Sequence, residues 1–73
     1  MNRDLCIMAC VFCKEPDFQR WAGVATEQAA KSFILKTCSI TSRNQLDTDV
    51  LAGATFHQQI RQPYMAWRDR RKP

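Results

Sequence analysis

Four cysteines and one histidine are the residues of this 73-residue chain most able to bind a metal ion or act as nucleophiles. Cys6, Cys10 and Cys13 follow the spacing C-x3-C-x2-C, which radical-SAM enzymes use to hold a four-iron cluster. Those enzymes support the cluster loop on a partial barrel that is far larger than this chain. The match is therefore interpreted as accidental, and no cofactor is expected.

A zinc site is a second interpretation of the same thiols. Together with Cys38 or His57, the three N-terminal thiols would supply four soft ligands, and a bound zinc ion would add stability to a domain this small. On a helix, however, the three N-terminal thiols are spread over about 10 Å at 1.5 Å rise per residue, whereas structural zinc takes its ligands from turns. Because cysteine is also among the most buried residue types, the sequence favours reduced core thiols over metal ligands or disulfides.

Catalysis by His57 would require a nucleophile such as Cys13 or Cys38, an orienting group and an oxyanion site. No feature of the sequence supplies the last two. We therefore predict that the chain is not an enzyme, and that His57 lies at the edge of a buried helical stripe.

The positive charge of the chain is concentrated at its C-terminal end. The formal net charge is +4, residues 1–60 hold as many acidic as basic side chains, and the whole excess lies in residues 61–73. Cations there alternate with aromatic rings, a combination that can neutralise phosphates and stack on exposed bases. The candidate binding residues are Arg61, Tyr64, Trp67, Arg68, Arg70, Arg71 and Lys72. In the structural alternative, the two aromatic residues belong to the core and the cations only favour a helix C-terminus.

The segment Thr37 to Leu46 has the pattern of the turn and second helix of a helix-turn-helix, with polar residues 42–44 where base contacts would begin. The polar segment is short, and the charges of Asp47 and Asp49 after it would repel phosphate. A capped turn between two packing helices explains the same residues, and we favour that interpretation.

Helices are the elements predicted to position these side chains, because the chain is 45% hydrophobic and 25% charged with only two glycines. Residues 3–14 form a helix that is apolar on most sides, so it must be central to the core or buried against a second chain. A homodimer is one expectation that follows. Pro16 marks a boundary, and a short helix over residues 17–22 comes after it.

Capping residues predict the next boundaries. Thr26 is expected to cap a helix that ends near Ser39, and Ser42 with Gln45 has the spacing of a capping box. Thr48 or Asp47 is then expected to cap the last helix.

The last helix carries apolar residues at steps of four, four, four and three, which places them on one face. These residues are Ala52, Phe56, Ile60, Tyr64 and Trp67. Pro63 must bend or break this helix near Gln62, so the basic end is expected to point away from the other helices.

These patterns predict an all-α fold, a compact bundle of four to five short helices with the last one bent at Pro63. One domain spans residues 1–73, with 68–73 as a basic tail. The predicted core contacts are made by Phe12, Phe33, Ile34, Phe56 and Ile60. No apolar run is long enough to cross a bilayer and no signal peptide is recognised, so a cytoplasmic protein of a bacterial host cell is expected.

The order of several short motifs resembles small uncharacterised proteins of temperate phages and prophages. The motifs are Leu5-Cys6-x-x-Ala9-x-x-Phe12-Cys13, Cys38-x-Ile40-x-Ser42-Arg43, Leu46-Asp47-Thr48, Phe56-His57, Ile60-Arg61-x-Pro63-Tyr64 and Trp67. The resemblance implies an accessory protein that binds nucleic acid or a nucleic-acid-processing enzyme. The alternative is an interaction protein that inhibits or redirects a host protein without touching nucleic acid. Neither involves a small-molecule substrate.

Overall fold

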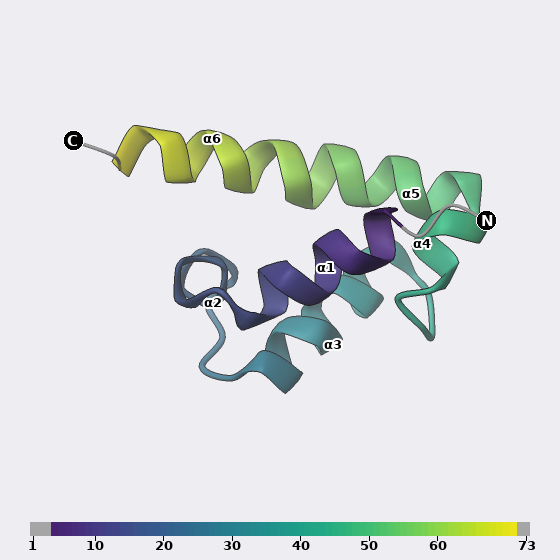
Figure 1. Ribbon diagram of the computed structural model, residues 1–73, viewed down its shortest axis with the longest axis horizontal. Coiled ribbons are helices and arrows are strands. Elements are labelled where there is room, and N and C mark those ends of the chain that lie inside the picture. Colours follow the sequence, from purple (N-terminus) through teal and green to yellow (C-terminus); the bar gives the residue numbers. More distant parts are fainter. Residues whose placement is uncertain (1–3, 72–73) are drawn as a thin grey trace.

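The computed structural model describes residues 4–71, and all the regular structure in that range is helical (Figure 1). The elements are α1 (Asp4–Lys14), α2 (Pro16–Ala22), α3 (Glu27–Cys38), α4 (Gln45–Thr48), α5 (Val50–Phe56), a π-helical turn η1 (His57–Arg61) and α6 (Gln62–Arg71). The last three form one continuous rod that lies along one side of the shorter helices (Figure 1). The prediction of a small all-α bundle is confirmed. Within the described range no helix is both long and apolar enough to cross a bilayer.

Helices α1 and α2 meet at a tight corner. Glu15 has an extended backbone, as the residue before a proline should, and Pro16 begins α2, where its missing N–H costs nothing. The side chain of Gln19 donates to the carbonyl of Cys13 at 2.9 Å, which supplies a partner to the end of α1. Helix α2 ends at Gly23, whose left-handed φ of 75° suits glycine.

Helix α3 has the boundaries that its capping residues predicted. The hydroxyl of Thr26 accepts from the backbone N–H of Ala29 at 3.0 Å. At the other end Ser39 adopts a left-handed φ of 56°, and the N–H of Ile40 donates to the carbonyl of Leu35 at 3.0 Å.

The predicted capping box at the start of α4 is only half formed. The side-chain oxygen of Gln45 accepts from the backbone N–H groups of Thr41 at 2.8 Å and Ser42 at 3.0 Å. The hydroxyl of Ser42, however, accepts from the N–H of Asn44, at 3.3 Å. Residues 42–44 therefore lie in a turn and do not begin a recognition helix.

Asp47 and Asp49 have roles that the sequence did not predict. The prediction that Thr48 or Asp47 caps the last helix is wrong, because Asp49 is the N-cap of α5 and accepts from the N–H groups of Leu51 and Ala52. Asp47 instead reaches the start of α1, where its two oxygens accept from the N–H groups of Leu5 at 3.0 Å and Cys6 at 2.9 Å. It is an N-cap supplied from another helix, with its negative charge placed favourably at a helix N-terminus.

The irregularity expected near Gln62 takes the form of the π-helical turn η1. The N–H of Gln62 donates to the carbonyl of His57, five residues earlier. Helix α6 then begins at Gln62, which places Pro63 in a first turn, where it needs no N–H. The rod continues past the proline without a break (Figure 1), so residues 68–71, predicted as a tail, form the last turn of α6.

The core is built around aromatic rings at the junction of α1, α2 and the rod. Phe12, Phe18 and Tyr64 are buried, with each pair of ring centroids 5.0 to 5.4 Å apart. Phe12, Ile34, Phe56 and Ile60 are buried as predicted, whereas Phe33 is half-buried and covers the edge of the cluster against Phe18 and Trp21. The predicted core contacts did not include Phe18 or Tyr64, both fully buried, although the structural alternative had placed Tyr64 in the core.

Candidate binding site

The residues predicted to bind a partner are not gathered on one surface. Arg61 is half-buried on η1, Tyr64 is in the core, and Trp67 and Arg68 are half-buried along α6. Arg70 is exposed on the last turn. Arg71 ends the helix, and Lys72 lies outside the described residues.

Tyr64 cannot serve as a stacking platform for a base, which corrects the prediction. Its side chain is 0% exposed, and its ring contacts those of Phe12, Phe18, Trp21 and Trp67. Its hydroxyl donates to the carboxylate of Glu15 at 2.8 Å. Burial and the neighbouring Glu15 carboxylate together raise the pKa of Tyr64 to about 12.

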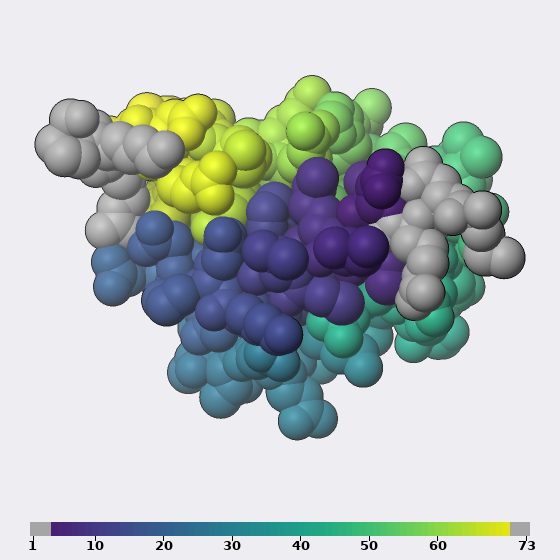
Figure 2. All heavy atoms as spheres, viewed as in Figure 1, coloured from purple at the N-terminus to yellow at the C-terminus, as the bar shows by residue number. Residues whose placement is uncertain are grey.

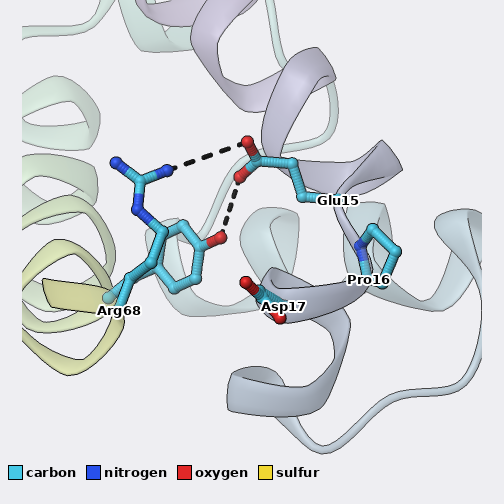
Figure 3. A pocket seen from close by; sticks show the side chains of 5 residues that line it. Glu15, Pro16, Asp17 and Arg68 are labelled. Carbon is cyan, nitrogen blue, oxygen red and sulfur yellow. Dashed lines mark hydrogen bonds and ion pairs between the residues drawn. The ribbon is translucent and has the colours of Figure 1, made fainter. Parts of the chain in front are cut away.

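Arg68 is turned toward the same carboxylate (Figure 3). Its guanidinium lies 3.8 Å from the second oxygen of Glu15 and 5.5 Å from the centroid of the Tyr64 ring, within range of a cation–π interaction. Another guanidinium nitrogen contacts the sulfur of Met65 at 3.1 Å. We call Glu15, Tyr64 and Arg68 the clamp. It holds α6 against the corner between α1 and α2, so the basic end does not point away as predicted.

The clamp lines a surface hollow together with Pro16 and Asp17 (Figure 3). The hollow contains two carboxylates and one guanidinium, and that guanidinium already faces Glu15. Its formal charge is therefore negative, so phosphate would not be attracted to it. The clamp is better explained as a structural contact than as a ligand site.

His57 and Arg61 form a second polar group, one turn earlier on the rod. A guanidinium nitrogen of Arg61 is 2.9 Å from Nδ1 of His57, and the side-chain amide of Gln62 is 3.2 Å from Nε2. Arginine can only donate, so Nδ1 is the acceptor in the contact with Arg61. His57 is half-buried at the edge of the rod, as its spacing predicted.

The cysteines lie on or near the core. Cys6, Cys13 and Cys38 are buried, Cys10 is half-buried, and all four are thiols. Burial raises the pKa of Cys13 and of Cys38. In the part of the chain that the structure describes, no three His, Cys, Asp or Glu side chains are close enough together to hold a metal ion.

Among the predicted binding residues, the cations left at the surface are on the last turn of α6, which lies over α2 at one end of the molecule (Figure 2). Arg70 is exposed there, and Arg71 follows it. Asp17 and Asp69 are exposed acidic residues of the two neighbouring helices and limit the positive potential. Comparisons with protein-family models, curated proteins and solved structures find no match to this chain.

Sequence reasoning missed Glu15 and Asp47, the two carboxylates that join distant parts of the chain. Glu15 precedes Pro16 at a predicted helix boundary, and that position was the only signal of a special role. Asp47 stands in a run of turn residues, where local capping explained it equally well.

Proposed function

We propose that the protein is a small accessory binding protein, of the kind carried by temperate phages, that contacts nucleic-acid phosphates through the last turn of α6. The supporting observation is that Arg70 and Arg71, two of the five C-terminal cations, belong to the last turn of a helix that the clamp fixes in place. The exposed Arg70 and the adjacent Arg71 are the main contacts, with Lys72 as the next cation along the chain.

A fixed helical end suits phosphate binding better than a flexible tail would. Fixing the backbone of a residue costs about 1–2 kcal/mol of conformational entropy. In α6 that entropy is already lost when the chain folds, so it does not weaken binding. Because Tyr64 is buried, the contact is electrostatic and carries little base specificity.

The test is the salt dependence of binding to a short labelled DNA duplex. With two to three phosphate contacts, the logarithm of affinity should fall with that of salt concentration with a slope of about −2 to −3. Replacing Arg70 and Arg71 with alanine should reduce both affinity and slope. The matched control replaces Lys31 and Lys36, two exposed lysines of α3, and removes the same charge elsewhere. If the two double variants bind DNA equally well, the end of α6 is not the site.

A second candidate function, an interaction protein that redirects a host protein, is supported by two adjacent apolar residues. Val50 is 86% exposed and Leu51 is 79% exposed at the start of α5. A contact through them would be nearly insensitive to salt, and Leu51→Lys would abolish it. The variant without Arg70 and Arg71 would retain it, which separates the two candidates.

A further inference from the structure

We infer that two copies of this chain associate through antiparallel packing of the outer face of α1. The buried residues of this helix are Cys6, Ala9, Phe12 and Cys13, which define the side that faces the core. At about 100° per residue, the opposite side is a stripe formed by Asp4, Ile7, Val11 and Lys14. All four are exposed, with Ile7 at 58% and Val11 at 50%.

The order of residues in this stripe is self-complementary. Along the helix it runs acid, apolar, apolar, base, over about 15 Å. Asp4 and Lys14 lie equally far on either side of Ala9, and so do Ile7 and Val11. A twofold axis that crosses the outer face of α1 at the level of Ala9 would therefore place Asp4 against the partner's Lys14 and Ile7 against the partner's Val11.

Charge complementarity identifies a second copy of this chain as the partner of the stripe, and it also fixes the direction in which the two helices pack. In a twofold dimer each contact is made twice, so the antiparallel arrangement gains two ion pairs around four apolar side chains. A parallel arrangement would place Asp4 against Asp4 and Lys14 against Lys14. A second copy of this chain thus fits the stripe in only one of the two directions.

The expected dimer is weak. A single pair of helices of this length buries less than the roughly 1,200 Å² at the lower end of standard interfaces, so a dissociation constant on the order of tens of micromolar is expected. Sedimentation equilibrium of the full chain under reducing conditions, over a range reaching high micromolar concentration, should show a monomer–dimer equilibrium. A monomer throughout the range would overturn the inference and leave the stripe to a different partner.

Charge reversal tests the direction of packing. Asp4→Lys alone and Lys14→Asp alone should each raise the dissociation constant about tenfold, because every opposed pair becomes repulsive. The double variant should restore dimerisation to near the wild-type level. In a parallel dimer the single reversals would change nothing, since like charges would still face like charges. Unchanged dimerisation in the single variants, or failure of the double variant to recover, would overturn the antiparallel assignment.

An apolar substitution tests the surface. Ile7→Lys should abolish the dimer, whereas Val50→Lys, which alters a more exposed apolar side chain on α5, should not. Circular dichroism of both variants verifies that the helices are retained. If Val50→Lys weakens the dimer as strongly as Ile7→Lys, the interface lies elsewhere.

Discussion

At the residue scale, Tyr64 shows how one side chain satisfies two interpretations of a sequence at once. Its position continues an apolar stripe, and Arg61 and Arg68 lie about one helical turn before and after it, so it fitted both a core and a stacking surface. The Glu15 carboxylate decides between them, because it accepts the hydrogen bond that a buried phenol hydroxyl needs.

The Tyr64–Glu15 contact should make stability sensitive to alkaline pH. Below about pH 10 the phenol is protonated in both states, and the full stabilisation is present. Between pH 10 and about 12 only the folded state keeps its proton, so the free energy of unfolding falls as pH rises through that window. Tyr64 is the only tyrosine, so tyrosinate absorbance reports it directly.

The matched variant is Tyr64→Phe, which keeps the ring and removes the hydroxyl. At neutral pH it should cost about 0.5–1.5 kcal/mol in urea unfolding, because the partly buried hydrogen bond from the hydroxyl to Glu15 is lost. It should also remove this tyrosine's contribution to alkaline destabilisation. A Tyr64 that titrates near pH 10 in the folded chain would show that the hydroxyl is exposed.

The four thiols should react at very different rates. Cys10 is half-buried, whereas the other three are buried, and a raised pKa further lowers the thiolate fraction of Cys13 and Cys38. One equivalent of a thiol reagent should react quickly with the folded chain, and all four should react after unfolding. Cys10→Ser should remove the fast phase. Rapid reaction of two or more thiols in the folded state would contradict the described packing.

At the scale of elements, α1 depends on a cap from α4. Asp47→Ala should destabilise the chain by about 0.5–2 kcal/mol in urea unfolding, because the N–H groups of Leu5 and Cys6 lose their acceptor. Asp69→Ala, at an exposed position of α6, is the control and should have little effect. Equal losses in the two variants would mean that overall charge, and not the cap, is responsible.

Gly53 allows α5 to approach α4 closely. A Cβ atom there would lie 2.8 Å from the carbonyl oxygen of Leu46 and 3.2 Å from a methyl group of Leu5. Gly53→Ala should therefore lose about 1–3 kcal/mol of stability, although alanine is the better helix former. Thermal unfolding compares it with Ser32→Ala, an exposed position of α3 where no loss is expected. An increase in stability on Gly53→Ala would show that the two helices are further apart.

Local signals predicted the elements better than they predicted the site. The cap at Thr26, the boundary at Pro16 and the stripe from Ala52 to Ile60 depend on nearest neighbours along a helix, and the structure confirms them. The clamp depends on Glu15 and Tyr64, which are 49 positions apart, and no local periodicity contains that information. The sequence therefore predicted where positive charge is concentrated along the chain, but not the contacts that turn Arg68 toward Glu15.

At the scale of the whole molecule, thermal stability should depend on protein concentration. If α1 joins two copies, the melting temperature should rise with concentration, because only the folded chain associates. Ile7→Lys should remove this dependence while leaving the helical spectrum intact. A melting temperature independent of concentration in the wild-type chain would agree with a monomer and contradict the α1 interface.

The contact between Asp47 and α1 also constrains how the chain can fold as it is synthesised. It joins Asp47 to Leu5 and Cys6, which precede it by 42 and 41 positions. Helix α1 therefore leaves the ribosome long before the Asp47 carboxylate that accepts its hydrogen bonds. Until residue 47 has emerged, the first helix lacks the acceptor that Asp47 supplies, and its core face lacks α5. We therefore expect the nascent N-terminal half to remain unstable and open to chaperones, and the core to close only when the second half arrives.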